Sequence, residues 1–258
     1  DLALSFWSFR SKSSINGETV RPAGRHLLPL QQVRLCWCSY VSTVFTSGFT
    51  PEVLGWRVHC KEGTGGHGAF SVEERGALMG SGERGKARHR DVVQSFLCIE
   101  GNVDPETNVI DTLFLVTGGL DHQVLVWDPR TLQFCFELKG HRGGVRSMSW
   151  DRSQGLLLTC GFEYDIKVWG LISRRIYFFF HLKGHRRPLV WVDCAAGNDR
   201  AVSLDDSGKL SCAHGAPATS SGCIDALVAA SSPDDVLFVA PKSDHTNVTG
   251  GTDYRPAL

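Results

Sequence analysis

The feature that most constrains how this chain folds is a set of polar and aromatic side chains that recurs at fixed spacing. In three places a tryptophan follows a threonine by ten residues, and an acidic or hydroxyl residue lies six before that tryptophan. The three sets are Thr46, Thr50 and Trp56; Thr117, Asp121 and Trp127; and Thr159, Glu163 and Trp169. Self-similarity at a period of about 40 residues is typical of a propeller or a solenoid.

A second spacing, upstream of the first, belongs to the same repeat. His89, His141 and His185 each precede one apolar residue by four positions and another by nine. Between these marks apolar residues alternate with a period close to two, with one irregular step between Val145 and Met148. This alternation predicts short antiparallel strands joined by turns, and no helix maintains it together with the fixed offsets.

These marks resemble the WD40 repeat family, through Gly140-His141, Gly184-His185, Trp127-Asp128 and Trp169-Gly170. The resemblance covers most of residues 1–212 and implies an all-β fold, a WD40 β-propeller of four-stranded antiparallel blades. In that family, with the strands of a blade lettered a to d, the Trp indole donates to a Ser or Thr hydroxyl. The hydroxyl bonds to the His, and the His bonds to an Asp in the b–c turn.

The network that the resemblance implies is unevenly preserved among the units of this chain. The unit at Trp127 holds all four members, and the unit at Trp169 has Glu163 in place of Asp. The unit at His185 keeps Ser203 but has Ala213 where the Trp would be, and the unit at Trp56 has Leu28 where the His would be. We expect these last two blades to depend mainly on apolar packing.

The spacing also predicts how the chain is divided. Residues 1–213 form the WD40 region, with the third strand of a first blade at 1–10 and blades at 29–80, 89–137, 138–183 and 184–213. A mobile insertion is expected at 59–88, a half blade made of the first two strands of another unit at 223–240, and a polar tail at 241–258. Because the family usually has seven blades, we expect an incomplete ring or a fragment of a seven-bladed propeller, and a closed five-bladed ring is the alternative.

Composition narrows the class of partner. Lys and Arg total 27 and Asp and Glu total 27, so no net charge favours nucleic acid or an acidic membrane. The longest apolar runs are far shorter than the roughly 20 residues that cross a bilayer. Nine cysteines without a CxxC pair indicate reduced thiols, hence a cytoplasmic protein, with the nucleus left open.

Three local patterns suggest chemistry, and each has a plainer explanation. Cys36 and Cys38 share one face of a strand, where core packing is favoured over a metal pair. Residues 80–87 nearly spell a phosphate-binding loop, but Ala87 replaces the required hydroxyl and no βαβ unit surrounds it. Asp205-Asp206 fits a b–c turn better than a catalytic pair. We therefore predict no metal, no cofactor and no enzyme activity, since the His and Ser/Thr residues belong to the network.

A surface pattern suggests recognition of a partner. An arginine follows each network His, and the b–c turns carry apolar and aromatic residues. In the family both segments lie on one face of the propeller, so they predict a surface for an acidic peptide or protein. The alternative is that these arginines are simply solvated at exposed turns. The residues are Arg90, Arg142, Arg186, Arg187, Leu120, Phe162 and Tyr164.

The family resemblance, rather than any catalytic pattern, leads to the functional hypothesis. We expect a non-enzymatic protein–protein interaction scaffold within a larger eukaryotic multi-subunit assembly. Irregular blades and long inserts are similar to those of the large multi-propeller proteins of cilia and the cytoskeleton. The alternative is an RNA-associated propeller in a ribosome-linked or RNA-processing complex, which the lack of regularly interleaved aromatic residues disfavours.

Overall fold

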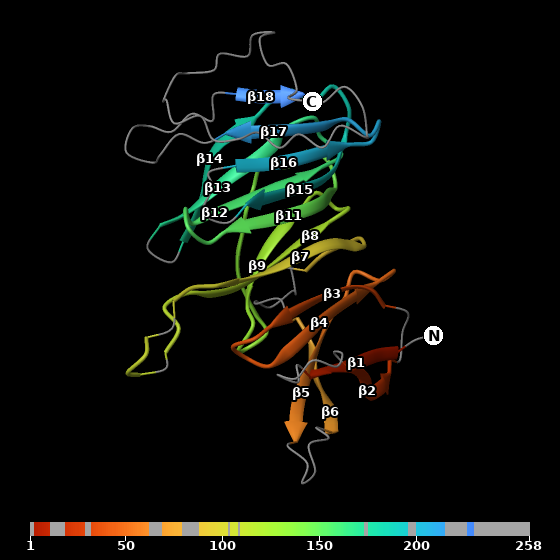
Figure 1. Ribbon diagram of the computed structural model, residues 1–258. Helices are drawn as coiled ribbons and strands as arrows, with labels where there is room; N and C mark the ends of the chain where they lie inside the picture. Colours follow the sequence, from red (N-terminus) through yellow and green to blue (C-terminus); the bar gives the residue numbers. More distant parts are fainter. Residues whose placement is uncertain are drawn as a thin grey trace.

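The computed structural model describes residues 3–10, 19–28, 32–61, 69–78, 88–102, 104–107, 109–172, 175–195, 200–214 and 226–229. Throughout these ranges the regular secondary structure is β (Figure 1). Within this part of the chain, no helix is long and apolar enough to cross a membrane.

The strands form one two-stranded and four four-stranded antiparallel sheets, and each sheet follows the order of the chain. The two-stranded sheet pairs β1 (Ala3–Arg10) with β2 (Thr19–Leu27). The first blade contains β3 (Gln32–Cys38), β4 (Thr43–Gly48), β5 (Val53–Lys61) and β6 (Ala69–Ala77). The second blade contains β7 (Val93–Glu100), β8 (Leu113–Gly119), β9 (Val124–Asp128) and β10 (Gln133–Glu137).

The third and fourth blades repeat the pattern. The third blade contains β11 (Val145–Asp151), β12 (Leu156–Gly161), β13 (Ile166–Ile172) and β14 (Arg175–Leu182). The fourth contains β15 (Leu189–Ala195), β16 (Arg200–Asp205), β17 (Leu210–His214) and β18 (Ala226–Ala229). The all-β fold of four-stranded antiparallel blades is therefore confirmed.

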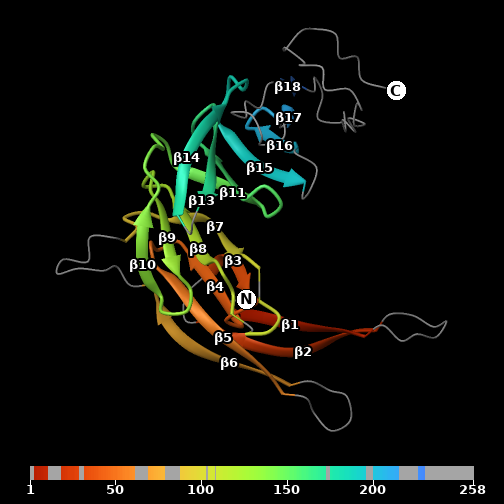
Figure 2. The same ribbon diagram turned by 90° about the vertical axis from the view of Figure 1, so that its left-hand side faces the viewer.

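The blades stack on one another through their first strands. β3 lies next to β7, β7 next to β11, and β11 next to β15. Figures 1 and 2 show the sheets following one another in chain order, with β1 and β2 beside the first blade. Consecutive blades therefore share one side, and their loops lie at two common ends.

Each first strand begins with a register shift in its pairing to the second. The shifts fall between Gln32 and Arg34, Val93 and Ser95, Val145 and Ser147, and Leu189 and Trp191. An extra residue in one strand moves the following side chains to the other face. This bulge explains the irregular step between Val145 and Met148 in an otherwise alternating sequence.

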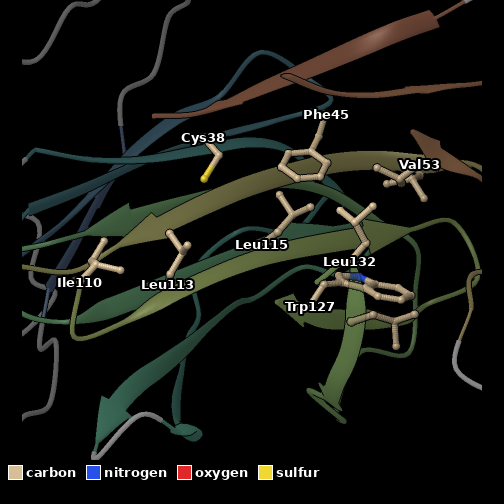
Figure 3. Packing of buried hydrophobic residues seen from close by; sticks show 10 residues of the cluster. Cys38, Phe45, Val53, Ile110, Leu113, Leu115, Trp127 and Leu132 are labelled. Atoms are coloured by element: carbon tan, nitrogen blue, oxygen red, sulfur yellow. The ribbon is translucent and has the colours of Figure 1, made fainter. Parts of the chain in front are cut away.

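The hydrophobic core consists of layers between adjacent sheets. Figure 3 shows Cys38 and Phe45 of the first blade facing Leu115 and Trp127 of the second. Further clusters join the second blade to the third, the third to the fourth, and β1 to the first blade through Leu4. Burial of each such Leu, Val or Phe side chain stabilises the fold by about 1.5–3 kcal/mol.

The prediction of a mobile insertion at residues 59–88 is wrong for a large part of that range. Ala69–Ala77 is strand β6, which pairs antiparallel with β5. Leu54 pairs with Ala77 at one end and Lys61 with Ala69 at the other. The outer strand of a blade has a free edge and carries charges such as Glu73, Glu74 and Arg75. That charge made the segment resemble a polar loop. Residues 62–68 and 79–87, which include the loop-like 80–87 pattern, lie outside the described residues.

The prediction of a separate half blade at residues 223–240 is also wrong. Ala226–Ala229 is strand β18, which pairs antiparallel with β17 and completes the fourth blade beyond the predicted limit of 213. A short apolar run fits a first strand and a last strand equally well, so the pattern did not distinguish them. Residues 230–240 and the polar tail at 241–258 lie outside the described residues.

Candidate functional site

The second blade contains the complete polar network. The Trp127 indole Nε1 donates to Thr117 Oγ1 at 2.8 Å, and Thr117 Oγ1 lies 2.7 Å from His89 Nε2. His89 Nδ1 lies 3.1 Å from the Asp121 carboxylate. When Nδ1–H donates to that carboxylate, Nε2 carries no proton and accepts a hydrogen bond from the Thr117 hydroxyl. The network ties strands β8 and β9 to the loop before β7.

The fourth blade keeps more of this network than its sequence suggested. His185 Nε2 lies 2.8 Å from Ser203 Oγ, and His185 Nδ1 lies 3.0 Å from Asp205 Oδ2. Burial alone would raise the pKa of Asp205, but hydrogen bonds from Ser207, His185 and the Lys209 amide outweigh it and lower that pKa to about 2. The network in this blade therefore includes His, Ser and acid, beside the apolar packing that the sequence predicts. Asp205 was missed because it lies two residues after Ser203 rather than four.

The third blade has an altered network. Trp169 Nε1 and His141 Nε2 lie 2.8 and 2.7 Å from Thr159 Oγ1. Glu163 Oε2, however, is 3.7 Å from His141 Nδ1, which has no hydrogen-bond partner. Burial and the positive charge of Lys167 lower the pKa of His141 to about 4, and Glu163 offsets them only in part.

The first blade retains the tryptophan bond alone. Trp56 Nε1 donates to Thr46 Oγ1 at 2.8 Å, and both side chains are buried. Leu28, which stands where the family has a histidine, packs in the same apolar cluster as Trp56. Apolar packing therefore takes the place of the histidine in this blade.

The networks fix the loops at one end of the blades. We call this end the upper face; its loops and turns are residues 88–92, 120–123, 139–144, 162–165, 183–188 and 206–209. Asp121 Oδ2 accepts a hydrogen bond from the Arg90 amide at 2.8 Å, and Glu163 accepts one from the Arg142 amide. Gly140 and Gly184 have φ of 149° and 151°, which L side chains rarely adopt, and this accounts for a Gly before each of these histidines.

The arginines predicted to bind a partner are exposed on the upper face. Asp121 and Glu163 bond to the backbone amides of Arg90 and Arg142, so the networks do not use these two guanidinium groups. Within the described part of the chain, their side chains form no hydrogen bond or ion pair. The four residues are Arg90, Arg142, Arg186 and Arg187.

The structure brings together two of the three predicted apolar residues. Leu120 of the second blade and Phe162 of the third converge on Gly144, where a Cβ atom would lie within 3.1 Å of both. Phe162 is 44% exposed and Tyr164 is 58% exposed. The sequence analysis missed Arg146, whose guanidinium carbon lies 3.8 Å from the centre of the Phe162 ring. Such cation–π stacking holds an exposed ring in place.

A possible metal-ligand group lies at the opposite end of the first two blades. The side-chain donor atoms of Cys38, Cys98 and Glu100 lie within 4.8 Å of one another. Cys38 does pack in the core, as its CxC spacing suggested. Its position beside two further donors is not visible in the sequence.

A family model and solved structures of known proteins resemble this chain. Residues 132–170 match the family model for the WD domain, G-beta repeat. The solved structure of U3-55K superposes with a TM-score of 0.52 at 18% identity, over 72% of this chain and 50% of that one. The chain contains a WD40 repeat at residues 132–170 and has the fold of a WD40 propeller. The second blade has the complete network that the family resemblance implied, and the other blades have part of it.

Two relatives extend the resemblance beyond one WD40 repeat. A WD repeat-containing protein of Schizosaccharomyces pombe is 26% identical over 204 residues, which are 75% of this chain and 35% of the relative. Cilia- and flagella-associated protein 337 B of Tetrahymena thermophila is 31% identical over 98 residues, or 38% of this chain and 8% of the relative. The chain thus spans about a third or less of the length of these two relatives.

Proposed function

We propose that this WD40 chain is a non-enzymatic interaction scaffold whose upper face binds an acidic segment of a partner protein. The observation that carries the proposal is the recurrence of an exposed arginine at the same loop position in three successive blades. Exposed aromatic side chains stand beside these loops. Arginine and aromatic residues are the side chains that most often dominate binding energy in protein interfaces.

The fixed loops support tight recognition. The amides of Arg90 and Arg142 bond to acids of the buried networks, so the backbone is already ordered before a partner arrives. Ordering a loop on binding costs free energy, and a preorganised loop avoids most of that cost. Guanidinium groups bind carboxylates in bidentate geometry, which suits Asp and Glu side chains of a partner.

The histidine environment supports a scaffold rather than an enzyme. Both ring nitrogens of His89 and of His185 are engaged within their networks. A general base needs a free nitrogen within reach of a substrate proton. These two buried histidines therefore serve the fold.

We further propose that the assembly is ciliary or cytoskeletal and that the protein acts in the cytoplasm. The support is the likeness over 98 residues to the Tetrahymena protein, whose name assigns it to cilia and flagella. Fluorescence microscopy of the tagged protein in ciliated cells tests this part. Enrichment along axonemes or basal bodies is expected, and a purely nuclear signal would reject it.

Charge reversal on the upper face tests the binding proposal. Peptides rich in Glu and matched peptides with Gln at the same positions are compared by fluorescence anisotropy. The triple variant Arg90→Glu, Arg142→Glu and Arg186→Glu should lose at least about tenfold in affinity for the acidic peptide, because removing complementary charge weakens association. The control is Arg175→Glu. Arg175 is exposed at the start of β14, at the end of the blades opposite the upper face.

Two outcomes would reject the proposal. One is equal binding of the Glu and Gln peptides by the unaltered protein. The other is that the unaltered protein binds no acidic peptide but retains single-stranded RNA in a salt-dependent way, and that the triple variant loses this retention. That result would favour the RNA-associated alternative.

A further inference from the structure

Two adjacent blades place sulfur and carboxylate donors together at the end opposite the upper face. β3 and β7 both start at the upper face, so Cys38 at the end of β3 and Glu100 at the end of β7 lie at the other end. The two strands are neighbours across the interface between the first and second blades. The donor atoms of Cys38, Cys98 and Glu100 lie within 4.8 Å of one another.

The separations suit one tetrahedral cation. Zn²⁺ binds thiolate sulfur at about 2.3 Å and carboxylate oxygen at about 2.0–2.2 Å, so its ligand atoms lie roughly 3.3–3.8 Å apart. Cys98 Sγ and Glu100 Oε1 are already separated by 3.8 Å. The other two separations are no more than 4.8 Å, so the thiol side chains have to rotate to bring all three donors to bonding distance.

Glu100 is held in a fixed orientation by the turn that follows β3. The Ser39 amide donates to Oε1 at 2.6 Å, the Ser39 hydroxyl donates to Oε2 at 2.5 Å, and the Tyr40 amide lies 3.4 Å from Oε1. A carboxylate offers about four lone-pair sites, two on each oxygen. The unused site is on Oε2, whereas Oε1 faces Cys98, so a cation that binds Oε1 has to displace the long bond from the Tyr40 amide. Outer hydrogen bonds of this kind orient the ligands of metal sites. Burial raises the pKa of Glu100, but the bonds from Ser39 outweigh it and keep the carboxyl ionised.

A third thiol lies close by. Cys36 precedes Cys38 by two residues on β3, so both side chains point to the same face, away from Trp37. Burial raises the pKa of Cys36 to about 12, and the hydrogen bond to Cys38 together with burial raises that of Cys98. Cys36 and Cys98 therefore keep their protons at neutral pH unless a cation displaces them.

We propose that Cys38, Cys98 and Glu100 form a Zn²⁺ site between the first and second blades, with Cys36 as the fourth ligand. Zn²⁺ is the divalent metal best suited to mixed thiolate and carboxylate donors in tetrahedral geometry. Each ligating thiol releases one proton to solvent when the metal binds. With four protein ligands the ion has no open position, so it joins the two blades and carries out no catalysis.

The experiment uses the full chain, reduced, treated with chelator and then titrated with Co²⁺ as a spectroscopic substitute for Zn²⁺. One equivalent should bind, with thiolate-to-cobalt charge-transfer absorption and the d–d bands of tetrahedral Co²⁺, and Zn²⁺ should displace it. Zn²⁺ should also raise the melting temperature, because a ligand that binds only the folded state stabilises it. Cys98→Ser should weaken Co²⁺ binding, reduce the charge-transfer absorption of each bound ion from that of three thiolates to that of two, and lower the rise in melting temperature.

Other variants separate a metal site from a structural role. Ser39→Ala removes a hydrogen bond to the ligand Glu100 and should weaken Zn²⁺ binding by about 10–100-fold while thiolate absorption persists. Cys135→Ser, which removes an exposed thiol on β10, should bind as the unaltered protein does. Cys38 is fully buried, so Cys98→Ser and Glu100→Gln are the informative ligand variants, with far-UV circular dichroism as the check of folding.

Three results would overturn the proposal. The first is the absence of stoichiometric Co²⁺ or Zn²⁺ binding by the reduced protein. The second is equal binding by Cys98→Ser and Cys135→Ser. The third is recovery of a Cys38–Cys98 disulfide, with no metal, from protein isolated without reductant, which would assign the cluster to a redox pair.

Discussion

Glu163 and Lys167 form a buried ion pair in the third blade, where the second and fourth blades have a direct histidine–aspartate contact. Lys167 is only 2% exposed, and a buried ammonium requires a partner of opposite charge. Glu163 provides it and also bonds to the Arg142 amide. His141 is left with Thr159 as its hydrogen-bond partner.

This pair makes the pKa of His141 depend on Lys167. Lys167→Met removes the positive charge that helps to lower that pKa and leaves the negative charge of Glu163 beside the ring. The pKa of His141 should therefore rise. Titration of the His141 ring by NMR measures it. Lys139→Met, at an exposed lysine before the same histidine, should leave it unchanged.

The stability of the unaltered protein should fall as the pH decreases from about 6.5 to about 4. In that range the unfolded chain binds a proton at His141 and the folded chain, with a pKa of about 4, does not, so acidification favours unfolding. The loss is on the order of 3 kcal/mol. Denaturant unfolding at successive pH values measures it. His141→Gln should flatten the curve, His122→Gln at an exposed position should not, and a flat curve in the unaltered protein would contradict the assignment.

Asp205 should govern stability at lower pH. Its folded pKa of about 2 lies below the usual value near 4, so the stability it contributes is present above pH 4 and is lost as the pH falls towards 2. The contribution is on the order of 2 kcal/mol. Asp205→Asn should reduce the pH dependence in this window, to which Asp121 and Glu163 also contribute through their lowered pKa values. Asp206→Asn, at the exposed neighbour, should behave as the unaltered protein; identical curves for the two variants would refute the role of Asp205.

The repeat could be predicted because its network ties residue types to fixed positions. Few other residue types have the donors and acceptors that the network needs at the positions of Trp127, Thr117 and His89. The spacing of these residue types is therefore recognisable in the sequence. The outer strands β6 and β18 could not be placed in the same way. They pair along one edge, and neither a charged segment nor a short apolar run at such an edge has a distinctive period.

The clusters formed between blades were invisible for a different reason. Cys38 and Glu100 are 62 residues apart, and their proximity depends on how two sheets pack. Arg146 and Phe162 lie within one blade, Arg146 in β11 and Phe162 in the turn after β12, and they meet beside the bulge in β11, which the spacing of the repeat does not reveal. Sequence spacing identifies the contacts of the network, whereas these contacts depend on tertiary structure.

The threonine at the centre of the network should be more important in the second blade than in the first. Thr117→Val leaves two buried groups unpaired, the Trp127 indole N–H and His89 Nε2, whereas Thr46→Val leaves only the Trp56 indole N–H. Each buried group without a partner costs about 1–3 kcal/mol, so Thr117→Val should lose about twice the free energy of unfolding. The two threonines are equally buried and valine has nearly the same shape, so packing changes largely cancel. Chemical denaturation of both variants measures the difference, and equal losses would mean that the histidine adds nothing to the stability of the second blade.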